Sequence, residues 1–345
     1  MSNEKFKQRA QLATLRIGGA LEILNVLKTF SIDPDEVLTT AGIDPDLFDN
    51  PDNLITYATR DRLLEHCVSE TGCRHFGLLV GQKMNLHSLG VVGSLMKTSP
   101  DVETALRSLV NFIQVHSQGA AMALKIEDNI ALLMYDTVAP VLDASGQTGD
   151  GAVAMMFNVM RELCGSSFKP VEASFAHRQP DDIQPFRKFF GVPVYFNAEH
   201  NTLVFSRTWL TARPEAADAD IQALLRNQVS GLQAKDKLEF PEQVRNVLRS
   251  ALMTGISSEE QIASLLSIHV RTLSRRLEQH GKSFHELVDE CRFELAQQML
   301  KKTTLGVNQI SDSLGYSRAS SFVRAFRRWS GSTPGQWRDD QSSAD

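Results

Sequence analysis

Two short segments near the C-terminus carry arginine and hydroxyl side chains at positions that share one face of a helix. Arginine can donate two hydrogen bonds to O6 and N7 of guanine, a contact worth roughly 1–3 kcal/mol of discrimination between bases, and Ser or Thr can bind several base edges. These residue types therefore predict direct reading of bases in the DNA major groove. The side chains expected to contact bases are Arg271, Thr272, Arg275, Ser320, Ser321 and Arg324.

The two segments belong to a repeated unit, found once in residues 257–280 and once in residues 307–329. Each copy predicts a short helix, a tight turn and a second helix, which is the helix-turn-helix layout whose second helix enters the major groove. Gly315 lies in the second turn, where glycine tolerates left-handed backbone geometry. The residues that match between the copies are Ile262 with Ile310, Leu266 with Leu314, Leu273 with Phe322, Arg275 with Arg324, and Leu277 with Phe326.

A longer helix is predicted between the copies, over residues 283–301, because apolar positions recur there without an interior Pro or Gly. At 1.5 Å per residue this helix is about 28 Å long, comparable with the ~34 Å turn of B-DNA. Both second helices can then face one side of a duplex. One chain is therefore expected to read two adjacent major-groove segments.

Charge is divided unevenly along the chain. Residues 1–240 hold 22 Lys and Arg against 29 Asp and Glu, whereas residues 241–338 hold 14 against 9. A local excess of positive charge is the electrostatic footprint of a nucleic-acid-binding module. Three arginines of this basic region are expected to contact phosphates, which position a protein without reading sequence. They are Arg327, Arg328 and Arg338.

Three motifs follow one another through the second copy. They are Ile310-Ser311-Asp312-Ser313-Leu314-Gly315-Tyr316-Ser317, Ser320-x-Phe322-x-Arg324-x-Phe326-Arg327-Arg328, and Gly331-x-Thr333-Pro334-x-x-Trp337-Arg338. Together they resemble the signature of AraC/XylS transcription regulators, and the resemblance covers about residues 245–338. Ser311 departs from the usual alanine, and Trp337 stands where Tyr or Phe is commoner. The resemblance implies a bacterial one-component activator that binds promoter DNA as a homodimer and contacts RNA polymerase.

The first two-thirds of the chain mixes helical and strand patterns. Helices are expected near 60–71, 101–117 and 150–164, a hairpin over 120–136, and short strands at 171–177, 193–196 and 201–205. There are too few strands for a jelly roll. The predicted fold is an α+β effector-binding and dimerisation domain over 1–213, a helical linker over 214–240, an all-α double helix-turn-helix domain over 241–338, and an acidic tail over 339–345.

Leu89-Gly90-x-x-Gly93 and Pro100-x3-Thr104-Ala105-Leu106 resemble the effector domains of one AraC-type subset, which includes ornithine-utilisation and mycobacterial virulence regulators. This resemblance implies a sensor of an unknown small molecule, rather than the cupin barrel of the arabinose regulator. Adaptable methionines beside polar anchors suggest pocket walls, although ordinary core packing explains the same pattern. The candidate effector-pocket residues are His116, Met155, Asn158 and Arg161, and Arg161 would suit a carboxylate.

No catalytic, cofactor or metal motif is expected to act in this chain. The sequence lacks a G-x-S-x-G elbow, a phosphate-binding Walker loop and an H-E-x-x-H motif, and its four cysteines show no zinc or disulfide spacing. A cytoplasmic protein with no cofactor is predicted, since no apolar run approaches a membrane span. The alternatives are a repressor, a ligand-independent architectural DNA-binding protein, and an enzyme with a DNA-binding appendage. The linker helix can be a coupler or a dimer contact.

Overall fold

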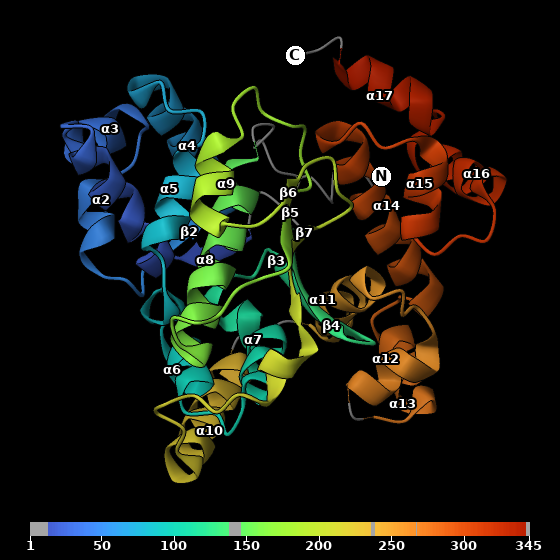
Figure 1. Cartoon of the computed structure of the whole chain (residues 1–345). Coiled ribbons are helices and arrows are strands. Elements are labelled where there is room, and N and C mark those ends of the chain that lie inside the picture. The colour runs from blue at the N-terminus through green and yellow to red at the C-terminus, as the bar shows by residue number, and fades with distance from the viewer. Residues whose placement is uncertain (1–12, 138–145, 236–238, 267, 343–345) are drawn as a thin grey trace. The chain divides into compact units, whose positions relative to one another are not determined.

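The computed structural model describes residues 13–137, 146–235, 239–266 and 268–342. The chain divides into two compact units: the first contains the described residues up to 196 together with 200–235, and the second contains 197–199 together with the described residues from 239 onward. Figure 1 labels the α-helices of both and strands β2–β7. In the described parts, no helix combines the length and the apolar character that crossing a membrane requires.

The first unit combines short strands with helices, as the predicted α+β class requires. Its strands are β1 (Thr14–Arg16), β2 (Leu54–Thr56), β3 (Ala120–Glu127), β4 (Ile130–Thr137), β5 (Glu172–Ser174), β6 (Val194–Tyr195) and β7 (Asn201–Ser206). Its α-helices are α2 (Leu21–Thr29), α3 (Pro34–Thr40), α4 (Tyr57–Thr71), α5 (Phe76–Lys83), α6 (Val91–Lys97), α7 (Val102–His116), α8 (Gln147–Cys164), α9 (Gln184–Phe190) and α10 (Ala219–Lys235). Its 3-10 turns are η1 (Ile17–Gly19), η2 (Pro45–Asp49), η3 (Leu86–Leu89) and η4 (Arg207–Thr211).

Five strands form one sheet in the order β3-β4-β7-β5-β6, in which only β5 and β6 run parallel. The predicted hairpin is observed, with Glu127 opposite Ile130 and Asp128 at a φ of 39° in the turn. β1 and β2 pair separately as an antiparallel ribbon. The described strands thus form one mixed five-stranded sheet and a separate two-stranded ribbon.

Helices α7 and α8 pack against this sheet and supply much of the core. α7 begins at Asp101, whose carboxylate accepts a 2.7 Å hydrogen bond from the backbone N–H of Thr104 and so satisfies one free donor of the first turn. α8 is buried along most of its length and also runs beside α5 (Figure 1). Helix α8 thus lies between the sheet and α5.

The helix predicted as a linker is observed as α10. Its Leu225 and Val229 pack against the core of the first unit, where α10 contacts α6 and α7. The side-chain amide of Gln233 donates to the carbonyl of Asn111 at 3.3 Å. The described part of this helix is therefore packed onto the first unit along one face.

The second unit is entirely helical in its described residues from 239 onward, as predicted. The helices are α11 (Phe240–Met253), α12 (Glu259–Leu265), α13 (Val270–Gln279), α14 (Phe284–Lys302), α15 (Val307–Ser313), α16 (Ala319–Ser330) and α17 (Pro334–Ser342). α12 with α13, and α15 with α16, form the two predicted helix-turn-helix copies. α14 starts with a capping box in which Ser283 and Glu286 bond each other's backbone N–H groups. Gly315 has a φ of +75°, the left-handed geometry expected for its turn.

Candidate DNA interface and effector cavity

Helix α13 separates a buried stripe from an exposed basic one. Leu273 and Leu277 are fully buried, whereas Arg271 and Arg275 are exposed and Thr272 is half-buried. The helix begins after His269, whose Nδ1 accepts a hydrogen bond from the backbone N–H of Arg271 at 3.2 Å. The core stripe fixes the rotation of the helix, so the predicted base-reading residues Arg271 and Arg275 face solvent.

Helix α16 repeats this arrangement in the second copy. Phe322 and Phe326 are fully buried and pack edge to face, while Ser320 and Arg324 are exposed. The half-buried Ser321 accepts a hydrogen bond from Nη2 of Arg324 at 3.2 Å. This contact orders the guanidinium along the exposed face, next to the hydroxyl with which it is expected to read bases.

Other arginines of this unit are occupied by the protein itself. Arg276 lies over the Phe240 ring at 3.8 Å and so holds α13 against α11. Arg328 is exposed but forms a 2.6 Å ion pair with Asp289 of α14. The guanidinium of Arg338, which was expected to contact phosphate, donates to the carbonyls of Leu300 and Leu305 at 3.0 and 2.8 Å. Arg338 thus binds the C-terminal end of α14, and Arg327 stays exposed.

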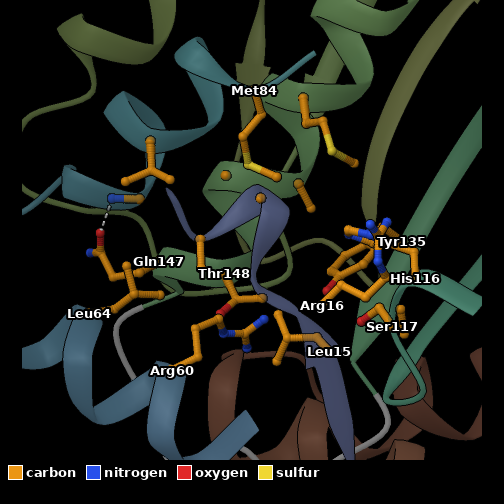
Figure 2. A pocket seen from close by; sticks show the side chains of 18 of the residues that line it. Leu15, Arg16, Arg60, Leu64, Met84, His116, Ser117, Tyr135, Gln147 and Thr148 are labelled. Atoms are coloured by element: carbon orange, nitrogen blue, oxygen red, sulfur yellow. Dashed lines mark hydrogen bonds between the residues drawn. The ribbon is translucent and has the colours of Figure 1, made fainter. Parts of the chain in front are cut away.

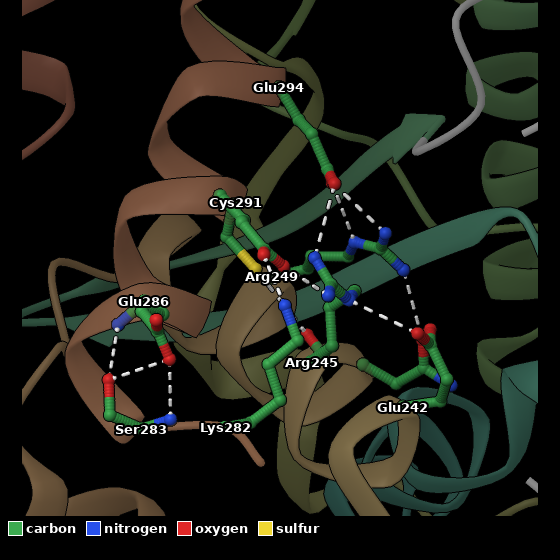
Figure 3. Close-up of polar contacts among 10 residues, drawn as sticks. Glu242, Arg245, Arg249, Lys282, Ser283, Glu286, Cys291 and Glu294 are labelled. Carbon is green, nitrogen blue, oxygen red and sulfur yellow. Dashed lines mark hydrogen bonds and ion pairs between the residues drawn. The ribbon is translucent and has the colours of Figure 1, made fainter. Parts of the chain in front are cut away.

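A network of buried charges fastens α11 to α14, the helix between the two copies (Figure 3). Arg245, which is 5% exposed, pairs with Glu290 and Glu294, and Arg249 donates two hydrogen bonds to Glu294 at 3.1 and 3.0 Å. Lys282 binds Glu290 at 2.7 Å. Burial opposes the charge of Arg245, but Glu294 and the other carboxylates outweigh it and raise the pKa of Arg245 above its ordinary value. These ion pairs join α14 both to α11 and to the segment just before it.

The first unit contains a partly open cavity of about 90 Å³, well above the ~10–15 Å³ that one water molecule occupies on this measure. Most of its wall is apolar. The lining comes from the β1–η1 segment, α2, α4, α5, α7, β3, β4 and α8. The apolar and small lining residues are Leu15, Gly19, Ala20, Ile23, Leu64, Gly77, Val80, Met84, Ile113, Ala120, Met122, Gly151, Ala152 and Met155. The polar ones are Arg16, Arg60, His116, Ser117, Tyr135, Gln147 and Thr148.

Arg16, His116, Ser117 and Tyr135 gather at one side of the cavity (Figure 2). The guanidinium of Arg16 occupies the space where a Cβ on Gly90 would stand, 2.0 Å from Nη1, and Gly90 has a φ of +60° that favours glycine. This explains one glycine of the Leu89-Gly90-x-x-Gly93 motif. Burial and the nearby Arg16 lower the pKa of His116 to about 4, so its imidazole is neutral near pH 7.

Arg60 and Gln147 line the other side, where the protein already satisfies much of their bonding. Arg60 donates two hydrogen bonds to Oδ1 of the buried Asp61 and lies over the Tyr57 ring at 4.4 Å. Oε1 of Gln147 accepts from the backbone N–H of Gly77 at 2.5 Å, the dashed contact in Figure 2. The Gln147 contact joins α8 to α5, whereas the contacts of Arg60 lie within α4.

The structure brings only some of the predicted pocket residues together. His116 and Met155 line the cavity, but Asn158 and Arg161 do not. The amide of Asn158 donates to the carbonyls of Gly81, Gln82 and Met84, which end α5, and Arg161 is exposed with its guanidinium 5.8 Å from the centre of the Phe157 ring. Arg16 was not predicted as a pocket residue, and the only sequence signal near it is the glycine motif whose Gly90 its guanidinium contacts.

Comparisons with known proteins agree with this two-part arrangement. Residues 32–214, more than half of the chain, match the family model described as the arabinose-binding domain of AraC transcription regulators. Residues 262–340 match a helix-turn-helix domain. The chain belongs to the AraC family of transcription regulators. It is therefore a DNA-binding regulator that carries an effector-binding domain.

Full-length relatives within the AraC family share this organisation. The ornithine utilization regulator of Pseudomonas aeruginosa is 24% identical over 320 residues, which cover 92% of this chain and 94% of the relative. The regulator VirS of Mycobacterium tuberculosis is 28% identical over 327 residues, which cover 91% and 93%. Among solved structures, the transcriptional regulator CdpR from Pseudomonas aeruginosa matches with a TM-score of 0.46 at 20% identity, covering 92% of this chain and 96% of that one.

Proposed function

We propose that this AraC-family regulator is an effector-responsive activator that reads two adjacent major-groove segments with α13 and α16. The observation that supports this most strongly is the equivalence of Arg275 and Arg324. Each is exposed, and each lies between two buried apolar residues of its second helix. Two copies of one surface on one chain fit two successive groove segments of one duplex.

The residues proposed to contact bases are exposed or half-buried on these two helices. In the first copy they are Arg271, Thr272 and Arg275, and in the second copy Ser320, Ser321 and Arg324. Arg327 and Arg328 are proposed as phosphate contacts, with Arg328 already oriented by Asp289. Arg338 is left out of this proposed interface because its guanidinium bonds two backbone carbonyls.

In this proposal the cavity of the first unit binds the effector, and the regulator acts by binding rather than by catalysis. The bound activator recruits RNA polymerase at promoters. Coupling requires that the effector bind one conformational state more tightly than another, since a ligand with equal affinity for both shifts nothing. A ligand-independent architectural protein and a repressor are the alternatives. The first lacks any effector response, and the second lowers transcription when it is bound.

A homodimer is part of the proposal, with the outer face of α10 as its contact. The apolar arc of α10 is wider than the strip that packs on α6 and α7, and it leaves Ile221, Leu224 and Leu232 exposed at 48%, 69% and 39%. If a second copy packed its own Ile221, Leu224 and Leu232 against these exposed residues, the contact would be isologous, as a twofold dimer requires. Leu224→Asp is expected to yield monomers in sedimentation velocity, while Arg226→Ala on the same helix leaves the dimer intact. Dimers of both variants would exclude α10 from the interface.

The DNA-binding proposal is tested by footprinting the DNA upstream of the protein's own and neighbouring genes. We expect protection of two adjacent major grooves per protomer. Arg275→Ala and Arg324→Ala should each weaken binding to the protected site by roughly ten- to hundred-fold and leave binding to random DNA nearly unchanged. Arg226→Ala, which removes one exposed charge from α10, serves as the matched control. Equal losses on specific and random DNA would reject base reading and leave phosphate contact.

A further inference from the structure

We propose that the cavity of the first unit binds a small carboxylate with a compact apolar body, whose head group lies between Arg16 and His116. The proposal rests on the effector-binding role of this unit and adds the chemical class of the effector. It also replaces Arg161 by Arg16 as the anion-binding group.

The charge of the cavity wall favours an anion. Two guanidinium groups line it, and no Asp or Glu is among the lining residues of the described chain. Arg60 is already paired with Asp61. Arg16 differs, because its side chain is 17% exposed while its ion-pair partner Asp52 is 69% exposed and lies outside the lining. A largely buried cation that has only a solvated counter-ion gains from a second anion in the cavity.

His116 supplies an unused hydrogen-bonding group beside Arg16. The residue is 7% exposed, and its Nδ1 has no hydrogen-bond partner among the described residues. An unpaired buried polar nitrogen costs free energy that a ligand hydrogen bond would recover. The imidazole is neutral near pH 7 because its pKa is lowered, so it can donate one hydrogen bond without adding charge. One guanidinium and one neutral imidazole match a single carboxylate.

The rest of the wall restricts what the carboxylate carries. Most of the remaining lining is aliphatic or methionine, including Leu64, Val80 and Met84, and Arg60 and Gln147 are already bonded to the protein. A sugar would bury several hydroxyl groups without partners there, and an ammonium group would meet two arginines. An apolar cavity of ~150 Å³ holds a benzene-sized molecule, so the ~90 Å³ here suits a short aliphatic chain.

Asp52 acts as an internal competitor in this scheme. Its carboxylate holds the guanidinium of Arg16 through an exposed ion pair at the edge of the β1–β2 ribbon. A ligand carboxylate would share or replace this partner from the cavity side. Removing Asp52 should therefore tighten acid binding, whereas removing the Arg16 charge should abolish it. A purely structural role of the pair predicts the same loss for both changes.

The test uses the full-length protein and sets of compounds that share one carbon skeleton: propionate, butyrate, isobutyrate and valerate, each with its amide and its amine. Neutral pentoses, including arabinose, complete the set. Binding is measured by isothermal titration and by thermal shift. We expect at least one acid to bind, its amide and amine to bind at least about ten-fold more weakly, and the pentoses not to bind. Arg16→Gln should lose acid binding, and Asp52→Asn should keep or strengthen it.

Three results would overturn the proposal: amides or amines that bind as well as the acids, acid binding unchanged in Arg16→Gln, or no binding by any acid. Because Arg16→Gln also breaks the Asp52 pair, the folded state of both variants is checked by circular dichroism and by their DNA affinity. DNA affinity with and without the bound acid separates this inference from the proposed function. If an acid binds but does not change DNA affinity, the ligand class stands and the acid is not the effector. If the protein shows no specific DNA binding but still binds an acid, the proposed function fails and the inference about the cavity stands.

Discussion

The two units of this regulator present their functional residues in different ways. In the second unit, the candidate DNA-reading side chains lie on the solvent faces of two regular helices whose opposite faces are buried by Leu273, Leu277, Phe322 and Phe326. In the first unit, the cavity is lined by residues from the β1–η1 segment, five helices and two strands that lie far apart in the sequence. The residues on one face of a helix follow from local sequence periodicity. The residues that line a cavity depend on how distant segments pack together.

The largest effect is expected from a substitution in the charge network that joins α11 to α14, the helix between the two DNA-reading copies. Glu294→Gln removes the buried carboxylate that Arg245 and Arg249 share. Removing one partner of a buried ion pair costs up to about 3–5 kcal/mol. Here Arg249 loses its carboxylate partner, while Arg245 keeps Glu290 and Glu242. Urea unfolding followed by the fluorescence of Trp329 and Trp337, in a Trp209→Phe background, reports this loss in the second unit.

A matched change at the edge of the same network calibrates that result. Glu242→Gln affects a half-exposed carboxylate 3.4 Å from Arg245 and should cost no more than about 1 kcal/mol. Equal effects of the two variants would mean that the buried network does not set the position of α14. Specific DNA binding should fall with Glu294→Gln and persist with Glu242→Gln.

The stability of the first unit is expected to depend on pH through His116, a buried residue of the cavity. The pKa of His116 is lowered from 6.5 to about 4 by burial and by Arg16. Between these values the unfolded chain takes up a proton that the folded chain does not, so stability is complete above pH 6.5 and decreases as the pH falls toward 4. The loss amounts to roughly 3 kcal/mol at most. Burial raises the pKa of neighbouring Tyr57 and Tyr135, which therefore titrate outside this range.

The variant His116→Gln isolates this contribution. Its free energy of unfolding, measured by urea titration at pH 7.5, 6 and 5, should fall less between the first and last pH than that of the parent protein. Carboxylates elsewhere, such as Glu290, titrate in both proteins and cancel in the difference. Parallel pH profiles would show that His116 is solvated or paired in the folded state.

The same contrast explains how far the sequence could predict this structure. The repeat placed Arg275 and Arg324 on exposed faces, and alternation placed the β3–β4 hairpin, because both signals are local. Asn158 shares a helix with the cavity residue Met155 but bonds the end of α5 instead, since side-chain direction there depends on a neighbouring helix. Arg16 enters the site from a three-residue strand whose position depends on its pairing with β2. No periodicity within so short a segment can reveal that.

A glycine of the effector unit offers a smaller effect that tests the architecture of the cavity. Gly90 combines a φ of +60° with a ψ of −130°, which only glycine adopts readily, and Arg16 fills the Cβ position. Gly90→Ala should lower stability by about 1–3 kcal/mol and displace the guanidinium, so acid binding should weaken. Gly42→Ala is the control, because Gly42 also has a positive φ (+73°) but has open space where its Cβ would stand. Thermal unfolding should show strain in both variants. Titration with whichever of the four acids binds the parent protein best should show loss of binding only in Gly90→Ala.

The smallest effect separates two arginines that the sequence could not tell apart. Arg327 and Arg338 both lie in the basic region, but Arg327 is exposed whereas Arg338 donates to the carbonyls of Leu300 and Leu305. If Arg327 neutralises one phosphate, Arg327→Ala should reduce the slope of log K against log salt concentration by roughly 0.9. Arg338→Ala should leave that slope unchanged and instead lower the stability of the second unit by about 1–2 kcal/mol, because two backbone carbonyls lose a charged donor. Filter binding across a salt series and urea unfolding measure the two quantities. A reduced slope for Arg338→Ala would return this residue to the DNA interface, because its bonds to the end of α14 would then have to give way when DNA binds.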